Sequence, residues 1–153
     1  DCIRSWSKNK PVIIRNLKST RPWQHVLEAI YGYMIFACSL KKNSLLNGHA
    51  FNFGPKNKND YSVNSVLLQA QKNWKNAKWV FKKKHKNFVE SNLLKLNSNK
   101  AKKYLNWECG LNFNETIDMT INWYKNFYNR KYKRVLDISI DDLKYYKKKL
   151  KIL

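Results

Sequence analysis

The sequence predicts an α+β domain built from several helices and a few short strands. Apolar residues recur at helical spacing in three long segments, which indicates amphipathic helices. Between them lie short β-branched or alternating stretches typical of strands. The chain has 153 residues, of which 43% are hydrophobic. Because this length supports one domain with a modest core, we expect residues 1–153 to form a single domain.

The periodic segments set the expected helices. They lie over residues 2–9, 26–42, 62–74, 97–105, 114–128 and from about 139 onward. Ser62 or Asn64 can cap the third of these, and Asn114 can cap the long helix that ends near residue 128. The last helix would carry Asp141 and Asp142 in its first turn, where acidic side chains suit the helix dipole.

The longest apolar stretch, residues 26–40, is interrupted by Glu28 and Gly32. No run of about 18 apolar residues exists, so a transmembrane helix is not expected. We expect residues 26–40 to form a buried helix instead. Farther along the chain, we expect the helix over 97–105 to be closed by a glycine in the segment 106–110. Neither a signal peptide nor a membrane partner is expected.

Short strands are expected at residues 12–14, 49–54, 78–81 and 93–96. Pro11 breaks the helix before the first of them, and Gly54-Pro55 ends the second. So few short strands need other elements to cover their faces. The chain also opens on a helical pattern without a methionine. We therefore expect it to be part of a longer protein.

The net charge is +21, which by itself suggests nucleic acid as a partner. However, 26 of the 31 basic residues are lysine and 5 are arginine, and asparagine occurs 20 times. Nucleic-acid readers favour arginine, whose planar fork makes bidentate contacts. We prefer a solvated lysine-rich surface, and a small basic nucleic-acid-binding module stays open as the alternative.

The cysteines and histidines show no ligand-like spacing. The three cysteines are odd in number and form no CxxC pair: Cys2, Cys38 and Cys109. They are typical of unpaired thiols in a cytoplasmic protein. The three histidines are isolated from one another and from the cysteines: His25, His49 and His85. No metal site is expected.

Two of the few arginines, Arg15 and Arg21, flank a short polar segment beside Trp23 and His25. A guanidinium binds two phosphate oxygens at once, so converging side chains would form a diphosphate clamp. Trp23 could form a wall of such a site, and His25 could donate a hydrogen bond. The alternative is that both arginines lie on the surface and that Trp23 belongs to the core.

Two further residues are weaker candidates. Asn52 lies beside a glycine in HAFNFGP, where its amide could hold a phosphate or a sugar hydroxyl, or could simply form a turn. Glu90, a lone acid among lysines, could line a pocket or form a surface ion pair. The four glycines are too far apart for a dinucleotide fingerprint, and there is no P-loop. The residues therefore predict no dinucleotide or P-loop site, and no Ser/His/Asp arrangement can be assembled from them.

The segment IRNLKSTRPWQHVLEAIYGY, from Ile14 to Tyr33, resembles the C-terminal part of CDP-glucose 4,6-dehydratases. These belong to the extended short-chain dehydrogenase/reductase superfamily. The family pattern is Ile-Arg-Asn-Pro, a spacer, Arg-Pro-Trp-Gln-His-Val-Leu-Glu and then Gly-Tyr. NFGP and the segments 90–107, 120–128 and 138–146 extend the resemblance over the whole chain. Asn106 stands where the family has the glycine before tryptophan.

The resemblance implies a fold and an activity. The chain would be the C-terminal substrate-binding part of an extended Rossmann-fold dehydratase. The NAD site and the catalytic Tyr, Lys and acid/base residues would lie in an N-terminal nucleotide-binding part that is missing here. The complete enzyme would oxidise C4 of CDP-glucose, eliminate water across C5 and C6 and return hydride to C6, in deoxysugar or O-antigen biosynthesis. This part alone would be inactive.

The resemblance also implies site residues and partners. Arg21 would hold the diphosphate with help from Asn52, and Arg15 would lie toward the nucleotide. The complete set of candidate substrate-binding residues is Arg21, Arg15, Asn52, His25, Trp23, Ile13 and Glu90. The ligand would be CDP-glucose or a related nucleotide-sugar, and the full enzyme would be a cytoplasmic homo-oligomer. Another extended sugar-nucleotide dehydratase or epimerase stays open as an alternative.

Overall fold

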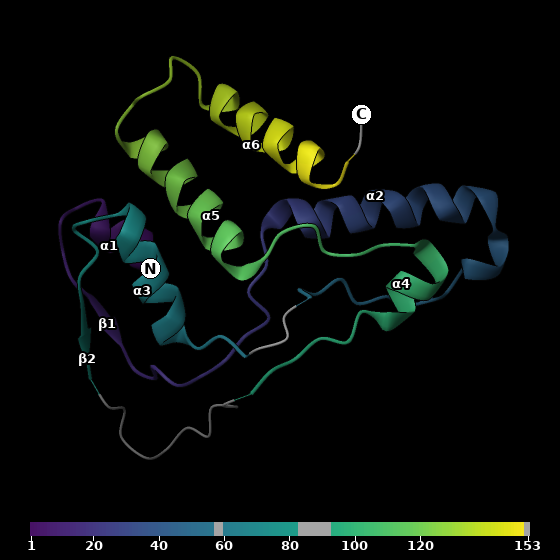
Figure 1. The fold of residues 1–153 in the computed structure, drawn as a ribbon, viewed down its shortest axis with the longest axis horizontal. Coiled ribbons are helices and arrows are strands. Elements are labelled where there is room, and N and C mark those ends of the chain that lie inside the picture. Colours follow the sequence, from purple (N-terminus) through teal and green to yellow (C-terminus); the bar gives the residue numbers. More distant parts are fainter. Residues whose placement is uncertain (57–59, 83–92, 152–153) are drawn as a thin grey trace.

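The computed structural model describes residues 1–56, 60–82 and 93–151 of the chain (Figure 1). Helices dominate, and the α+β class is confirmed. The elements in chain order are α1 (Cys2–Trp6), β1 (Val12–Ile14), α2 (Val26–Lys42), a 3-10 turn η1 (Ser44–Leu46), α3 (Val63–Asn73), β2 (Trp79–Phe81), α4 (Asn99–Leu105), α5 (Phe113–Tyr128) and α6 (Val135–Lys149). In the part of the chain described, no helix is long and apolar enough to cross a membrane.

The two strands form a parallel pair, with Val12 opposite Trp79 and Ile13 opposite Val80. Val12 is buried on the inner face of this sheet, whereas Ile13 is exposed. The indole of Trp6 donates a 2.9 Å hydrogen bond to the carbonyl of Lys78, which holds α1 against the chain just before β2. The strands predicted at 12–14 and 78–81 are therefore confirmed.

The strands predicted at 49–54 and 93–96 are wrong, because neither segment has a ladder partner among the described residues. The first segment instead contacts Ser98, two residues beyond the second segment. The backbone amide of Gly54 donates to Oγ of Ser98 at 2.8 Å, and that hydroxyl donates to the carbonyl of Gly54 at 3.3 Å. A β-carbon on Gly54 would lie 2.7 Å from Cβ of Leu96, so only glycine permits this approach.

Several helix ends differ from the prediction. α6 begins at Val135, four residues before the expected start, so Asp137 lies in its first turn and Asp142 in its middle. α5 begins with a capping box in which Asn112 and Glu115 exchange hydrogen bonds, and Asn114 is not its cap.

Of two other helix ends, one agrees with the prediction and one does not. Ser62, one of the two caps considered for α3, accepts a hydrogen bond from the amide of Ser65. α4 ends at Asn106 in the left-handed conformation (φ 51°), not at a glycine. Asparagine tolerates this conformation better than most residues because its short polar side chain bonds locally.

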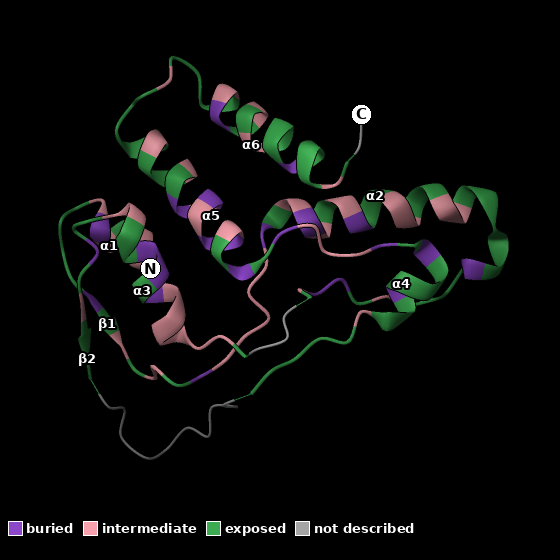
Figure 2. Ribbon diagram, in the orientation of Figure 1, coloured by how far each residue is buried: buried purple, intermediate pink, exposed green. Residues whose placement is uncertain are grey.

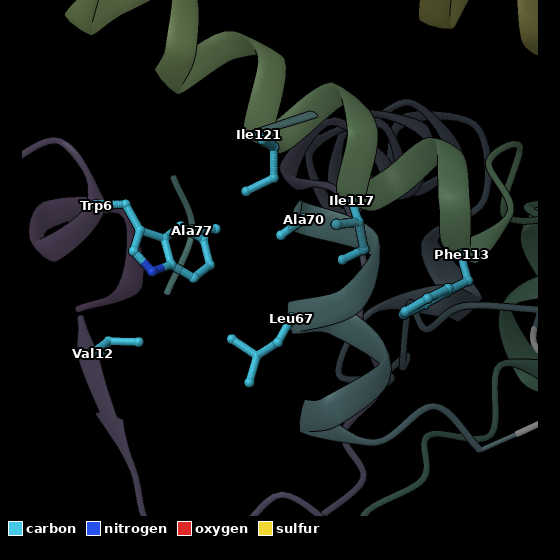
Figure 3. Close-up of a cluster of buried hydrophobic side chains, with 8 residues drawn as sticks. All are labelled: Trp6, Val12, Leu67, Ala70, Ala77, Phe113, Ile117 and Ile121. Carbon is cyan, nitrogen blue, oxygen red and sulfur yellow. The ribbon is translucent and has the colours of Figure 1, made fainter. Parts of the chain in front are cut away.

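The main core lies between α1, the sheet, α3 and α5 (Figure 3). Its buried members are Trp6, Val12, Leu67, Ala70, Ala77, Phe113, Ile117 and Ile121. A second cluster of buried residues joins α4 to α2 through Leu46, Phe53, Ala101, Leu105 and Trp107. Figure 2 shows that buried residues of α2 occur near its first turns, while much of the helix is exposed or half-buried. The buried helix expected at 26–40 is thus covered on one side only.

Candidate functional site

The loop between β1 and α2 carries both candidate arginines, and its own side chains shape it. Oδ1 of Asn16 accepts hydrogen bonds from the amides of Lys18 and Ser19, at 2.9 and 3.1 Å. This is an Asx-type turn, in which a side chain replaces a backbone acceptor. Ser19, which belongs to this turn, is buried. The polar segment that separates Arg15 from Arg21 is therefore an ordered turn.

The same loop is fixed to the N-terminus of α3. The amide of Val63 donates to the carbonyl of Ser19 at 2.9 Å, and that of Asn64 donates to the carbonyl of Leu17 at 3.0 Å. An isolated antiparallel bridge joins Thr20 to Ser62. These contacts satisfy amides that a helix start leaves without intrahelical acceptors. The backbone on both sides of the turn is thus held by tertiary hydrogen bonds.

The two arginines lie at opposite ends of this turn. Arg15 directly follows β1 and is exposed, whereas Arg21 is half-buried. Nη1 of Arg21 donates a 2.7 Å hydrogen bond to the carbonyl of Thr20, the residue that bridges to Ser62. Because its own guanidinium contacts an anchored backbone, Arg21 is held more firmly than Arg15. The clamp that these arginines would form stays a prediction.

Trp23 and His25 have structural contacts of their own. The indole of Trp23 donates to the carbonyl of Tyr61 at 2.8 Å, and its ring packs against the main core. His25 is buried and caps α2, with Nδ1 accepting from the amide of Leu27 at 3.3 Å. Burial lowers the pKa of His25, which keeps the ring neutral at pH 7. Any contact of these two residues with a ligand stays a prediction.

The remaining candidates lie apart in the chain. The side chain of Ile13 is 57% exposed on the outer face of the sheet. Asn52 is exposed, while the next two residues, Phe53 and Gly54, are buried. Glu90 falls outside the described residues. The NFGP segment is therefore buried at Phe53 and Gly54, while Asn52 faces solvent.

A cavity of about 630 Å³ adjoins the NFGP segment. Three lysines line it, and Lys56 and Lys102 both form ion pairs with Glu108, the first at 2.9 Å. These bonds lower the pKa of Glu108 to about 2, so its charge persists at neutral pH. The cavity is therefore basic at its rim, with one carboxylate shared between two ammonium groups.

A second cavity, of about 440 Å³, lies where α5 and α6 meet the start of α2. Trp123 and Tyr124 line it, and Trp123 donates from its indole to Oγ of Ser139 at 3.0 Å. The amide nitrogen of Gln24 is buried at this cavity without a hydrogen-bond partner among the described residues. No local pattern in the sequence indicates this cavity, because its walls come from segments about 100 residues apart.

Glu28 was also missed as a key residue. It is 0% exposed, and its Oε1 accepts hydrogen bonds from the amides of Gly110 and Leu111 at 2.9 and 2.7 Å. A single acid inside an apolar helix is the signal that could have revealed it, since such a group is buried only with donors around it. Glu28 ties the helix that follows the arginine loop to the connection between α4 and α5.

The chain is 33% identical over 126 residues to the CDP-glucose 4,6-dehydratase of Salmonella typhimurium. The resemblance predicted from the sequence is confirmed. The matched residues make up 82% of this chain and 35% of the relative, so the chain spans about a third of the length of the protein it matches. No protein-family model matches the chain. The kinship with a dehydratase thus rests on a partial match that covers most of the present chain.

Proposed function

We propose that this chain is the substrate-binding portion of an NAD-dependent sugar-nucleotide 4,6-dehydratase, and that its ligand is CDP-glucose. The match of 126 residues to a protein of that activity carries the proposal. The anchored turn between Arg15 and Arg21 supports it, because a phosphate site benefits from donors that are positioned before the ligand arrives. The full activity requires parts that this chain does not supply.

In this proposal Arg21 binds the diphosphate. Its backbone neighbour Thr20 is bridged to Ser62, so the guanidinium starts from a fixed point. Arg15 and the exposed Ile13 lie toward the nucleotide, at the end of β1 and on its outer face. Asn52 contributes an amide near the phosphates. Binding energy from the non-reacting diphosphate would position the sugar for chemistry carried out elsewhere.

NAD itself does not fit the described residues of this chain. A dinucleotide site needs a glycine-rich turn between a strand and a helix so that the backbone can approach the pyrophosphate. The segment from β1 to α2 contains no glycine before Gly32, which is itself within the helix. We therefore place the NAD site outside this chain and derive no redox step from it.

Calorimetric titration of CDP into the chain tests the proposal. We expect Arg21→Ala to weaken CDP binding by about tenfold or more, because charged hydrogen bonds to phosphate contribute about 1.5–3 kcal/mol. Arg134→Ala is the matched control: Arg134 pairs with Asp137 at the start of α6 and should leave the affinity unchanged. Arg21→Lys should recover part of the loss.

Titrations with UDP and CMP test which base the site prefers and whether it needs the second phosphate. Tighter binding of CDP than of UDP supports the cytidine assignment, and loss of affinity with CMP locates the contribution of the second phosphate. If Arg21→Ala and Arg134→Ala weakened CDP binding equally, the proposed site would be contradicted, because the net charge of the chain would then account for the binding. Tight DNA binding that falls steeply with salt would favour the nucleic-acid alternative.

A further inference from the structure

Helix α2 is apolar around its whole circumference. One face packs inward through Leu27, Tyr31, Ile35, Phe36 and Leu40. Glu28, the only charged residue of the helix before Lys41, is fully buried. A helix that is hydrophobic on all sides is normally enclosed by protein, because a surface helix keeps a polar face toward water. The sequence of α2 is thus that of a core helix.

The outer face of α2 is nevertheless largely uncovered, and only at its edge does the ring of Tyr33 meet that of Phe53, with 5.7 Å between the ring centroids. Val26, Tyr33 and Met34 are each 63% exposed, and Ile30 is 44% exposed. Ala37 and Cys38 continue the same face and are also exposed. These six residues, here called the α2 stripe, recur every three or four positions and so form one continuous band. Figure 2 shows exposed positions recurring along α2. Contiguous apolar bands of this kind mark interaction surfaces.

The sheet repeats the pattern on a separate element. Ile13 and Val80 are opposite each other in the parallel pair and are 57% and 45% exposed. Parallel sheets are found with both faces covered by other elements. One face of this sheet rests on the main core, and the outer face has apolar residues in the open. Both α2 and the sheet therefore expose an apolar face that is normally packed against other protein.

We propose that the α2 stripe docks on the part of a sugar-nucleotide dehydratase that corresponds to the unmatched portion of the Salmonella relative. This rests on the proposed function. The matched segment is 35% of that relative, so the larger part of such an enzyme is available to cover the stripe. The stripe carries no charge, which suits an apolar intramolecular or interdomain contact.

Charge argues against a second copy of this chain as the occupant. The chain has a net charge of +21, and Lys41 and Lys42 follow the stripe directly on α2. Two copies packed stripe to stripe would bring these lysines and the whole positive field together. A partner with a different charge balance avoids that repulsion.

The first test uses the chain as it is. Ile30→Gln with Met34→Gln keeps good helix formers but makes the middle of the stripe polar. Leu45→Gln is the control, because Leu45 is 81% exposed in η1 and lies outside the stripe. We expect the double variant to lose about half of the fluorescence of an apolar dye, and its thermal midpoint to stay within about 2 °C of the parent. A chain that binds no dye would overturn the proposal.

The second test places this chain in the Salmonella dehydratase, where it replaces the matched segment. There the double variant should lower the thermal midpoint by about 5 °C or more, since polar groups would be buried in the contact, while Leu45→Gln should not. If the double variant lowered the thermal midpoint equally in the chimera and in the isolated chain, the proposal would be overturned. It would also be overturned if the chimera that carries the unchanged α2 stripe did not fold.

Other occupants give different results. Sedimentation that shows a dimer of the isolated chain, broken by the double variant, would assign the stripe to a second copy. Binding to phosphatidylserine vesicles that the double variant abolishes would assign it to a membrane surface. Either result overturns the proposal. CDP affinity is measured separately, so a failed sugar-nucleotide site and a failed docking surface are told apart.

Discussion

The hydroxyl of Tyr146 donates a 2.7 Å hydrogen bond to Oε2 of Glu28, although the two residues are 118 positions apart. Both side chains are buried, at 2% and 0% exposure. Burial, and then the hydrogen bond and charge of Glu28, raise the pKa of Tyr146 well above its usual range. With the amides of Gly110 and Leu111 on Oε1, the carboxylate joins α2, the α4–α5 connection and α6.

Glu28→Gln should destabilise the fold strongly. The amides of Gly110 and Leu111 both bind Oε1, and Tyr146 binds Oε2, so glutamine can still accept from the two amides but removes the negative charge that strengthens all three hydrogen bonds. We expect the free energy of unfolding to fall by about 2–4 kcal/mol, because hydrogen bonds to a charged group contribute more than those to a neutral amide. Tyr146→Phe should cost less, about 1–2 kcal/mol, since both backbone bonds remain. Urea unfolding at pH 7 measures both.

Glu108→Gln is the matched control for this substitution. Glu108 pairs with two lysines at an exposed site, where ion pairs contribute little. Its free energy of unfolding should stay close to that of the parent chain. A loss at Glu108 equal to that at Glu28 would show that general charge, and not the buried network, sets the stability.

Asp142→Asn should make stability less dependent on pH. Burial, and then the neighbouring Asp141, raise the pKa of Asp142 from 3.8 to about 6. The folded state therefore holds this proton more tightly than the unfolded state, and stability falls as pH rises from about 4 to 6. At pH 7 the variant should gain about 1 kcal/mol, a figure reduced for the partial exposure of the group.

The measurement is the difference between parent and variant in urea unfolding at several pH values. The gain should shrink as pH falls through 6 and vanish below 3.8, where both states of the parent are protonated. Asp137→Asn is a control of opposite sign. Hydrogen bonds to Arg134 lower the pKa of Asp137, so this variant should not gain stability at pH 7. A gain for Asp142→Asn that persists unchanged at pH 3 would rule out titration as its cause.

The sequence predicted the helices better than the strands. The apolar period of α2 and α5 extends over four turns or more, so it locates each helix within a residue or two. The strand-like segments at 49–54 and 93–96 cover only a few residues each and say nothing about a ladder partner, which depends on tertiary contacts. Ser98 supplies the contact in place of a ladder.

The candidate site was only partly visible in the sequence for the same reason. Residue type makes Arg21 a candidate phosphate ligand, which stays a prediction, but nothing local in the sequence shows that Asn16 and the start of α3 hold its loop. Glu28 was visible as an acid in an apolar run. Its partners, Gly110 and Tyr146, are 82 and 118 residues away, and only the fold brings them together.

Asn106→Gly should stabilise the chain. Asn106 ends α4 with φ 51°, a left-handed conformation that glycine adopts without cost and that the resembled dehydratases fill with glycine. We expect a gain of up to about 1 kcal/mol, and a loss of about 1 kcal/mol for Asn106→Ala, in thermal or urea unfolding. Lys103→Gly, at an exposed position inside the same helix, should destabilise it and so controls for a general effect of glycine.

Gly32→Ala tests the contact between α2 and the NFGP segment. Helix propensity alone predicts a gain of about 1 kcal/mol, since Gly32 lies inside α2. However, the β-carbon of an alanine at this position would lie 2.5 Å from Cδ1 of Phe53. The ring of Phe53 packs edge-on against Trp107, with 5.0 Å between the ring centroids. Because that ring cannot withdraw without disturbing the second core cluster, we expect a net loss of about 1–3 kcal/mol.

A double-mutant cycle separates the two effects. In a Phe53→Leu background the smaller side chain relieves the clash, so Gly32→Ala should there be neutral or stabilising. The same cycle should restore CDP binding if the clash displaces Asn52, which directly precedes Phe53. A stabilising Gly32→Ala in the parent chain would mean that the NFGP segment is not held against α2. The packing of Phe53 on Gly32 is thus what couples the segment that carries Asn52 to the helix that follows Arg21.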